Sequence, residues 1–553
     1  TRAGMNSFAS LLNHPDISFL PIPDSIKVDN PATGETLAFV RTTRSDGLKL
    51  LYQAGFLHPR NLGALAFGML RHGFNLQALL YQATRLHPFQ TAVCGNDSRT
   101  DWQTLYLDSR RYASVLSEYP AWRQRRKTAV LCRNTPESVA VLSALSAGGM
   151  PVLLFNADMS AEQLHTLLRQ YDPGLLLTDD GLSAKVGGLP FDIVSFGELS
   201  AAAQRIETPK PLPRRTAGEM LVLTGGTGGN SRIVRRKTSA RISVLPMLVL
   251  LKTLRLHQRQ NVYIGPPFYH GYGIAALYFS LALRRTMLLT ERFDARRAAE
   301  LITREQAEIA VLVPTMLYRL LDAMPQRGRL KTVLTGSAML SAEAARRTLG
   351  QWGNVLYNLF GTTETGFALM AAPEQLAAKP DSIGRPFPGV TVEIRRADGS
   401  LCGIGETGSL WLKTGWSAQS RNHDVCTGDL AKADADGDIF LQGRADDMAV
   451  CGGENVYPQD VCRMTEQHPK VRQAAVLVIE HAEYGQALAL FAEAEKGLDA
   501  AALRLWLAGR LARYQMPQRI GITRELPISE AGKIDRRQLN EWLSAHCERD
   551  FLL

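Results

Sequence analysis

An alternation of short apolar runs and amphipathic stretches constrains the fold of this chain more than any other feature. Strand-like apolar runs at 127–132, 150–155 and 174–177 are separated by segments at 136–147 and 161–170 whose apolar residues recur at helical spacing. Strands that alternate with helices of this length predict parallel βαβ units. Similar runs at 220–223, 262–264, 286–290, 309–313 and 332–335 extend the pattern. The sequence therefore predicts a large α/β domain.

Two changes of pattern divide the rest of the chain. Residues 388–443 are rich in β-type runs separated by Gly and Asp turns, and the final hundred residues have their own helix (458–467), strand (474–480) and helix (500–513). We predict an extension at 1–73 with a hairpin and a lead-in helix. A large domain follows at 74–444, with parallel βαβ sheets and a β-rich subdomain. A small mobile α+β domain at 445–553 would be hinged near Asp446.

Composition bounds the partners and the compartment. A chain of 553 residues is too long for one core. Its net charge of +10 suits polyanionic ligands such as nucleotides. The sequence contains no dense Lys/Arg block with interleaved aromatics, so it does not predict nucleic-acid binding. The seven cysteines are scattered and form no C-x-x-C pair, which indicates reduced thiols in a cytoplasmic protein without zinc. No apolar run approaches the roughly 18 residues that would span a membrane.

A glycine-rich loop follows the strand at 220–223. It contains four glycines and two threonines and leads into a basic stretch. Glycine lets backbone N–H groups approach an anion closely, and hydroxyl and basic groups add donors, so the loop predicts phosphate binding. The alternative is a flexible surface turn with a solvated basic flank. The loop fits neither the P-loop nor the dinucleotide pattern. Its candidate phosphate-binding residues are Thr224, Gly225, Gly226, Thr227, Gly228, Gly229 and Arg232.

Five further segments follow this loop in a fixed order. They are Phe-Gly-Thr-Thr-Glu at 360–364, Thr-Gly-Asp-Leu at 427–430, Gly-Arg-Ala-Asp-Asp at 443–447, Gly-Gly-Glu-Asn-Val-Tyr-Pro at 452–458 and Gly-Lys-Ile-Asp at 532–535. The set resembles the adenylate-forming family of acyl-CoA synthetases, luciferases and peptide-synthetase adenylation domains. Within that family, the closest likeness is to bacterial fatty acyl-CoA synthetases, and it extends from about 74 to 539.

The resemblance implies an acid–thiol ligase. Such an enzyme activates a carboxylic acid, here expected to be a fatty acid, to acyl-AMP and then transfers the acyl group to a thiol. The implied cofactors are ATP, Mg²⁺ and CoA, or the phosphopantetheine of an acyl carrier protein. One alternative is an acyl-AMP ligase that loads a carrier protein. Its substrate could be an aryl acid instead of a fatty acid. Another is a non-catalytic ATP- or acyl-binding protein, which would lack Lys533, Glu364 or Asp429, although all three are present.

Lys533 is the expected catalytic residue. By the resemblance, its ammonium enters the site only during adenylation, where it would offset charge between the carboxylate and the α-phosphate. The alternative is a solvated lysine in a Gly-Lys turn. The small domain would then rotate about Asp446, and Gly453 would line the pantetheine channel.

The resemblance also implies a nucleotide site. Glu364 would be the Mg²⁺ ligand, since a hard cation suits a carboxylate, and its alternative is a surface glutamate. Phe360 would stack on adenine, with a core role as the alternative. Asp429 would accept from the ribose hydroxyls and Arg444 would contact ribose or phosphate, unless both are ordinary turn residues. The remaining candidates are Gly336, Ser337 and Ala338 at adenine, with Gly361, Thr362 and Thr363 at the phosphates.

The segment at 266–273 resembles the family's acid pocket. His270 would contact the carboxylate or shape the pocket, and a capping or core histidine is the alternative. The segment has no acidic residue to bind an α-amino group, so an apolar acid is favoured. Small residues would leave a tunnel for an acyl chain, or would pack helices closely: Gly271, Gly273, Ala275, Ala276, Gly336 and Ala368. Two departures from the family pattern are Arg232 in place of lysine and a shortened segment at 414–427.

Overall fold

The computed structural model describes Tyr52 and residues 58–224, 232–236, 240–362, 364–416, 424–445, 449–451, 454–481, 485–529, 531–546 and 550–552. Side chains at 222–246, 450, 452–455, 485, 550 and 552 are outside this description. The hairpin expected near the N-terminus and the hinge at Asp446 both lie outside the described residues. Among the described helices, none is long and apolar enough to cross a membrane.

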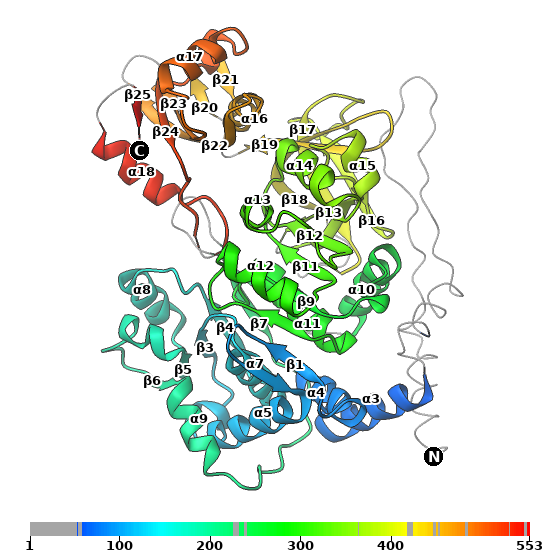
Figure 1. The fold of residues 1–553 in the computed structure, drawn as a ribbon. Helices are drawn as coiled ribbons and strands as arrows, with labels where there is room; N and C mark the ends of the chain where they lie inside the picture. The colour runs from blue at the N-terminus through cyan, green and yellow to red at the C-terminus, as the bar shows by residue number, and fades with distance from the viewer. Residues whose placement is uncertain are drawn as a thin grey trace.

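The largest sheet has nine strands in the order β15-β14-β13-β12-β11-β9-β10-β1-β2 (Figure 1). Neighbouring strands from β1 to β13 run parallel, and β2, β14 and β15 pair antiparallel at the two ends. The strands are β1 Thr91–Cys94, β2 Arg99–Asp101, β9 Val262–Ile264, β10 Met287–Leu289, β11 Ile309–Leu312, β12 Thr332–Gly336, β13 Leu356–Thr362, β14 Gly366–Ala371 and β15 Arg385–Pro386.

A second sheet has the order β6-β5-β3-β4-β7-β8 and is parallel except for β8. Its strands are β3 Thr128–Leu131, β4 Val152–Phe155, β5 Leu175–Thr178, β6 Asp192–Ser195, β7 Met220–Thr224 and β8 Arg232–Arg236. Every residue of β3, β4 and β5 is buried, as expected of parallel strands covered on both faces. These strands confirm the predicted βαβ units.

Helices cover and separate the two sheets (Figure 1). Two of them begin at caps that the sequence contains, because the Thr135 hydroxyl accepts from Ser138 N–H at 3.1 Å and the Ser160 hydroxyl from Gln163 N–H at 3.2 Å. The helices are α3 Pro59–His72, α4 Leu76–Leu86, α5 Trp102–Leu116, α6 Pro120–Arg123, α7 Pro136–Gly148, α8 Ala161–Tyr171, α9 Phe196–Gln204, α10 Ala240–Leu254, α11 Gly271–Leu283, α12 Ala295–Arg304, α13 Pro314–Ala323, α14 Ala342–Trp352 and α15 Pro373–Ala378. Helix α3 is the expected lead-in helix.

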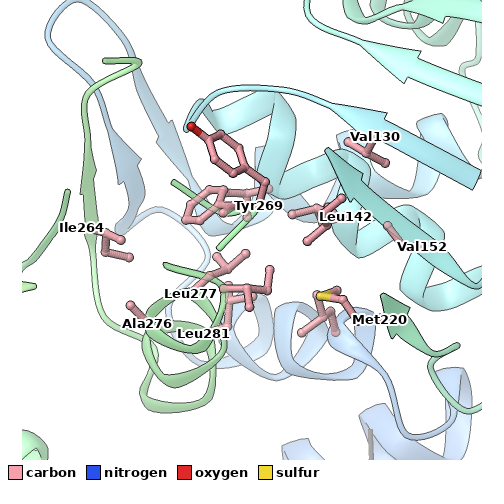
Figure 2. Packing of buried hydrophobic residues seen from close by; sticks show 14 of the residues in the cluster. Val130, Leu142, Val152, Met220, Ile264, Tyr269, Ala276, Leu277 and Leu281 are labelled. Carbon is pink, nitrogen blue, oxygen red and sulfur yellow. The ribbon is translucent and has the colours of Figure 1, made fainter. Parts of the chain in front are cut away.

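Helix α11 lies between the two sheets and is the centre of the main core. Figure 2 shows its Leu277 and Leu281 facing Leu142 of α7 and Met220 of β7. Leu277 and Leu281 are fully buried. Burial on this scale contributes about 1.5–3 kcal/mol for each large apolar side chain, so α11 is fixed in place by non-directional packing.

The β-rich part and the small domain complete the molecule. The first is an antiparallel sheet of β16 Val390–Arg395, β17 Gly408–Thr414, β18 Val425–Ala433 and β19 Ile439–Arg444. The second contains β20 Ala449–Cys451, β21 Glu454–Val456, α16 Pro458–Thr465, β22 Val471–His481, β23 Gly485–Ala494, α17 Ala500–Ala508, β24 Arg519–Thr523, α18 Arg536–Ala545 and β25 Asp550–Leu552. The small domain has its own apolar core, separate from that of the large domain. The predicted fold class is therefore confirmed.

The structure differs from the sequence analysis in two details. No strand was predicted at 232–236, and these residues form β8, which pairs antiparallel with β7, from Thr224–Arg232 to Met220–Arg236. The glycine loop therefore connects the two strands of a hairpin. The helix expected at 500–513 ends at Ala508, before Gly509, a residue that disfavours helix by about 1 kcal/mol relative to alanine.

Candidate active site

The predicted nucleotide and acid segments meet at one edge of the nine-stranded sheet. The acid segment follows β9, α13 follows β11, the segment 336–338 ends β12, and 360–364 ends β13. These strands are parallel neighbours, so their carboxyl ends lie at the same edge, where open α/β sheets bind ligands. The register pairs Gly336 with Leu359, which brings the expected adenine segment next to Phe360.

Residues 526–535 of the small domain form a hairpin that ends at this edge (Figure 1, red). Ser529 N–H donates to Lys533 C=O and Asp535 N–H to Pro527 C=O, both at 2.8 Å. Gly532 at the tip has φ of +68°, and a Cβ there would lie 2.3 Å from Cγ2 of Val313. Glycine is therefore required both by the turn and by the close contact with α13. We call this segment the Lys533 hairpin.

Two residues of α13 hold the Lys533 hairpin. The Thr315 hydroxyl donates to Gly532 C=O. Arg319 Nη2 donates to Leu526 C=O at 3.1 Å and forms an ion pair with Glu525 at 2.9 Å. Nearby, Arg472 of the small domain lies 3.6 Å from Asp322 of α13. The contact between the two domains at this hairpin therefore combines hydrogen bonds and ion pairs with the packing of Gly532 against Val313.

His270 and Lys533, predicted to act in one site, are brought together. His270 precedes the first turn of α11, and its Nε2 is buried with no hydrogen-bond partner among the described residues. Burial, and secondarily the charge of Lys533, lowers the pKa of His270 to about 3. Lys533 is an exposed residue, yet desolvation by the protein around its ammonium lowers its pKa. The imidazole is thus neutral at physiological pH, and the positive charge of Lys533 acts on it electrostatically.

A buried asparagine, Asn134, fixes the acid segment. Asn134 follows β3, and its Nδ2 donates to Pro266 C=O at 3.0 Å while its Oδ1 accepts from Phe268 N–H at 2.9 Å. Gly273 also packs against this turn, since a Cβ there would lie 2.2 Å from Pro267 C=O. The second sheet therefore positions the acid segment of the first.

An apolar cavity runs along α11. It is lined by Tyr272, Ala276, Phe279, Ser280, Leu283 and Arg285 from or near α11, and by Leu250, Leu256, Val262, Ile309, Val311, Leu334, Leu359 and Phe367. Its volume of about 40 Å³ holds a few waters at roughly 10–15 Å³ each, so a ligand enters only as the lining shifts. Of the small residues expected to leave a tunnel, Ala276 lines the cavity. Gly273 and Gly336 instead allow close backbone contacts.

The motif at 360–364 occupies the β13–β14 turn. Gly361 packs closely against Gly366, because a Cβ would lie 2.0 Å from Gly366 C=O. Thr362 Oγ1 accepts from Thr365 N–H at 3.1 Å, which holds the turn. Glu364 is half-buried in it. A carboxylate placed here matches the oxygen ligands that Mg²⁺ prefers. Thr363 lies outside the described residues.

Asp429 and Arg444, both expected at the ribose, are neighbours on β18 and β19. Arg444 Nη1 lies 3.4 Å from Asp429 Oδ1 and donates to Thr427 C=O at 3.2 Å. Gly428, the residue before Asp429, has φ of +77°. Directly after β12, Ser337 has φ of +68°, an uncommon conformation for a non-glycine residue that marks the turn after Gly336.

Part of the predicted site lies outside the described residues. This applies to Gly225, Gly226, Thr227, Gly228, Gly229 and Gly453. Only the backbone of Thr224 and Arg232 is described, as the last and first residues of β7 and β8. One group of carboxylates in the described chain is close enough to hold a metal, Asp434, Asp436 and Asp438, but the Lys379 ammonium binds all three, so they form an ion-pair network.

The comparisons with known families match this arrangement. Residues 80–419 match the AMP-binding enzyme family, and residues 464–533 match the AMP-binding enzyme C-terminal domain. The first match covers more than half of the chain, so the chain belongs to the AMP-binding enzymes. The predicted family is therefore confirmed, and with it the class of enzyme, an AMP-forming acid–thiol ligase.

Several of the similar proteins are CoA ligases. The chain is 27% identical to 2-succinylbenzoate–CoA ligase of Lactococcus lactis, over 79% of this chain and 97% of that protein. It is 26% identical to that of Bacillus subtilis, over 84% and 97%. Its fold matches the Bacillus subtilis o-succinylbenzoate CoA synthetase bound to its acyl-adenylate, with TM-score 0.72, 23% identity and coverage of 85% and 98%. An anthranilate CoA ligase bound to anthranoyl-AMP gives 0.73 at 19% identity, with coverage of 85% and 98%.

Sequence reasoning missed three residues that build the site: Asn134, Thr315 and Arg319. Each acts on a segment more than 100 residues away along the chain. A polar residue just after a buried strand, as Asn134 is, would have been the available signal. Thr315 and Arg319 have no such signal in the sequence, because their hydrogen-bond partners belong to another domain.

Proposed function

We propose that the chain uses ATP to convert a carboxylic acid to its acyl-adenylate and then transfers the acyl group to CoA. The observation that carries this proposal is the docking of Lys533 beside His270, at the sheet edge where the nucleotide segments also end. We infer that this arrangement corresponds to the adenylation step, in which the ammonium would act on the reacting carboxylate.

The residues divide the chemistry among them. The Lys533 ammonium offsets negative charge as the carboxylate attacks the α-phosphate. Neutral His270 would donate a hydrogen bond from its ring N–H to an oxygen of the carboxylate. Asp429 and Arg444 bind the ribose side, and the backbone at Gly336 and Phe360 forms the adenine side. Mg²⁺, held by Glu364, neutralises phosphate charge when bound.

The acid has an apolar body. The cavity along α11 is lined by aliphatic and aromatic side chains, and the segment 266–273 has no acidic residue. The named relatives act on 2-succinylbenzoate, an aryl acid, which favours an aryl acid over the fatty acid expected from the sequence. A fatty acid remains the second candidate, because the cavity's apolar lining continues along α11 from Tyr272 to Leu283.

ATP–pyrophosphate exchange across matched aryl and aliphatic acids tests the activity and the choice of acid together. We expect exchange that depends on Mg²⁺ and on an aryl acid, and CoA-dependent release of AMP. If AMP release requires an acyl carrier protein and is independent of free CoA, the acyl acceptor is the carrier protein and not CoA. An absence of exchange with every acid would leave a binding protein rather than a ligase.

A further inference from the structure

Helix α3 is rich in apolar residues but is little buried. It has no charged residue between Arg60 and Arg71, and only Gly68 and His72 of its 14 residues are buried. A helix that is apolar on most of its sides normally lies inside a protein or against another apolar phase. At this length α3 is too short to cross a bilayer, which needs about 20 residues. Its composition therefore indicates a surface that is covered by something other than the protein's own core.

One side of α3 packs on α4, at an edge of the large domain (Figure 1). A Cβ at Gly68 would lie 2.8 Å from Ala78 C=O, so the two helices are in close contact there. Nearer the start of α3, Gln82 Nε2 of α4 donates to Asn61 C=O at 3.0 Å. These contacts fix the rotation of α3 about its axis, and with it the side that faces outward.

The outward side carries an apolar pair between two arginines. It consists of Arg60, Gly63, Phe67, Leu70 and Arg71, all of which are exposed. Their spacing of three and four residues places them along one face of the helix. Phe67 is 54% exposed and Leu70 is 56% exposed. We call these five residues the α3 stripe.

The charge around the α3 stripe has one sign. The sequence from 47 to 96 contains no Asp or Glu, and within the part of the chain that the structure describes no carboxylate forms an ion pair with Arg60 or Arg71. A second copy of the chain, paired two-fold on this stripe with its helices antiparallel, would bring the two arginine ends together and be repelled. A surface with many negative charges and an apolar interior matches both the arginines and the pair between them.

We propose that the α3 stripe binds the surface of an anionic phospholipid bilayer. The helix lies in the plane of the interface, with Phe67 and Leu70 at the boundary between headgroups and acyl chains. Arg60 and Arg71 bind lipid phosphates. Two apolar side chains and two charges give reversible binding that weakens as salt screens the charges. The interaction goes beyond the proposed ligase activity and does not depend on it.

The test is co-sedimentation of the full chain with vesicles of phosphatidylcholine alone or mixed with phosphatidylglycerol. We expect more binding to the mixed vesicles, and less as NaCl is added. The double variant Phe67→Gln with Leu70→Gln should weaken this binding at least about tenfold. Arg60→Gln with Arg71→Gln should weaken it about tenfold on mixed vesicles and leave the phosphatidylcholine baseline unchanged. The control is Leu505→Gln in the small domain, a leucine that is 79% exposed and should not affect binding.

Three outcomes would overturn the proposal. The first is equal sedimentation with the two kinds of vesicle. The second is binding that survives in the Phe67 and Leu70 variant, because another surface would then hold the lipid. The third is a dimer in the absence of lipid, seen by analytical ultracentrifugation and lost in that variant, which would assign the stripe to a second copy. Urea unfolding checks each variant, and the arginine variant carries the test if the other does not fold.

Discussion

The Lys533 hairpin and helix α11 meet at one site but are held there by different forces. The hairpin contacts α13 through Thr315, Arg319 and an ion pair. Helix α11 is packed between two sheets by fully buried leucines. A hydrogen bond exchanged for water costs only about 0.5–1.5 kcal/mol, whereas apolar burial cannot be replaced by solvent. The difference predicts that the lysine can leave the site while the acid pocket stays assembled.

The firmest test of the pocket side is Gly273→Ala. A Cβ would lie 2.2 Å from Pro267 C=O and 2.5 Å from Pro266 C=O, so backbone must move. We expect a loss of about 3 kcal/mol in the free energy of unfolding, measured with denaturant. Gly271→Ala is the control, because a Cβ there meets nothing within 4 Å. Equal effects of the two substitutions would mean that the turn is not tightly packed.

Arg319→Ala tests the hairpin side. Removing the guanidinium takes away the bond to Leu526 C=O and the pair with Glu525, so the adenylation pose is less populated. The rate of acyl-AMP formation should fall about tenfold, the size expected for bonds to a charged group. Thioester formation from supplied acyl-adenylate should change little. Arg346→Ala, which removes an exposed pair with Glu343, should leave both steps alone. A matching loss in thioester formation would contradict the separation of the two regions.

The buried imidazole predicts a pH dependence on the pocket side. The pKa of His270 is lowered to about 3, so between pH 6.5 and 3 the unfolded chain binds a proton that the folded chain does not. Stability should therefore fall as pH falls through this window, by about 1 kcal/mol per unit from this residue. His270→Asn should flatten the slope measured by urea unfolding at several pH values. His72, whose pKa burial lowers to about 4, keeps its own contribution in the variant. An unchanged dependence of the unfolding free energy on pH would mean that the His270 imidazole is exposed to solvent in the folded protein.

The sequence predicted the parts of the molecule that local pattern encodes. Buried apolar runs located β3, β4, β5 and β9 to β12. It did not predict β8, because three of its five residues are arginines and the segment lacks a strand pattern of its own. The segment becomes a strand by pairing with β7. Sequence reasoning also missed Asn134 and Arg319, whose partners are 132 and 207 residues away. Contacts across domains leave no local signature, and they decide where Lys533 sits.

The most direct test of the account is single-turnover measurement of both half-reactions in Lys533→Ala. We propose that the ammonium acts only while the hairpin is docked, so acyl-AMP formation should fall by about 10²–10³-fold. Thioester formation from supplied acyl-adenylate and CoA should stay at the wild-type rate. Equal losses in the two steps, or an unchanged rate of acyl-AMP formation, would contradict a detachable lysine that serves a permanent acid pocket.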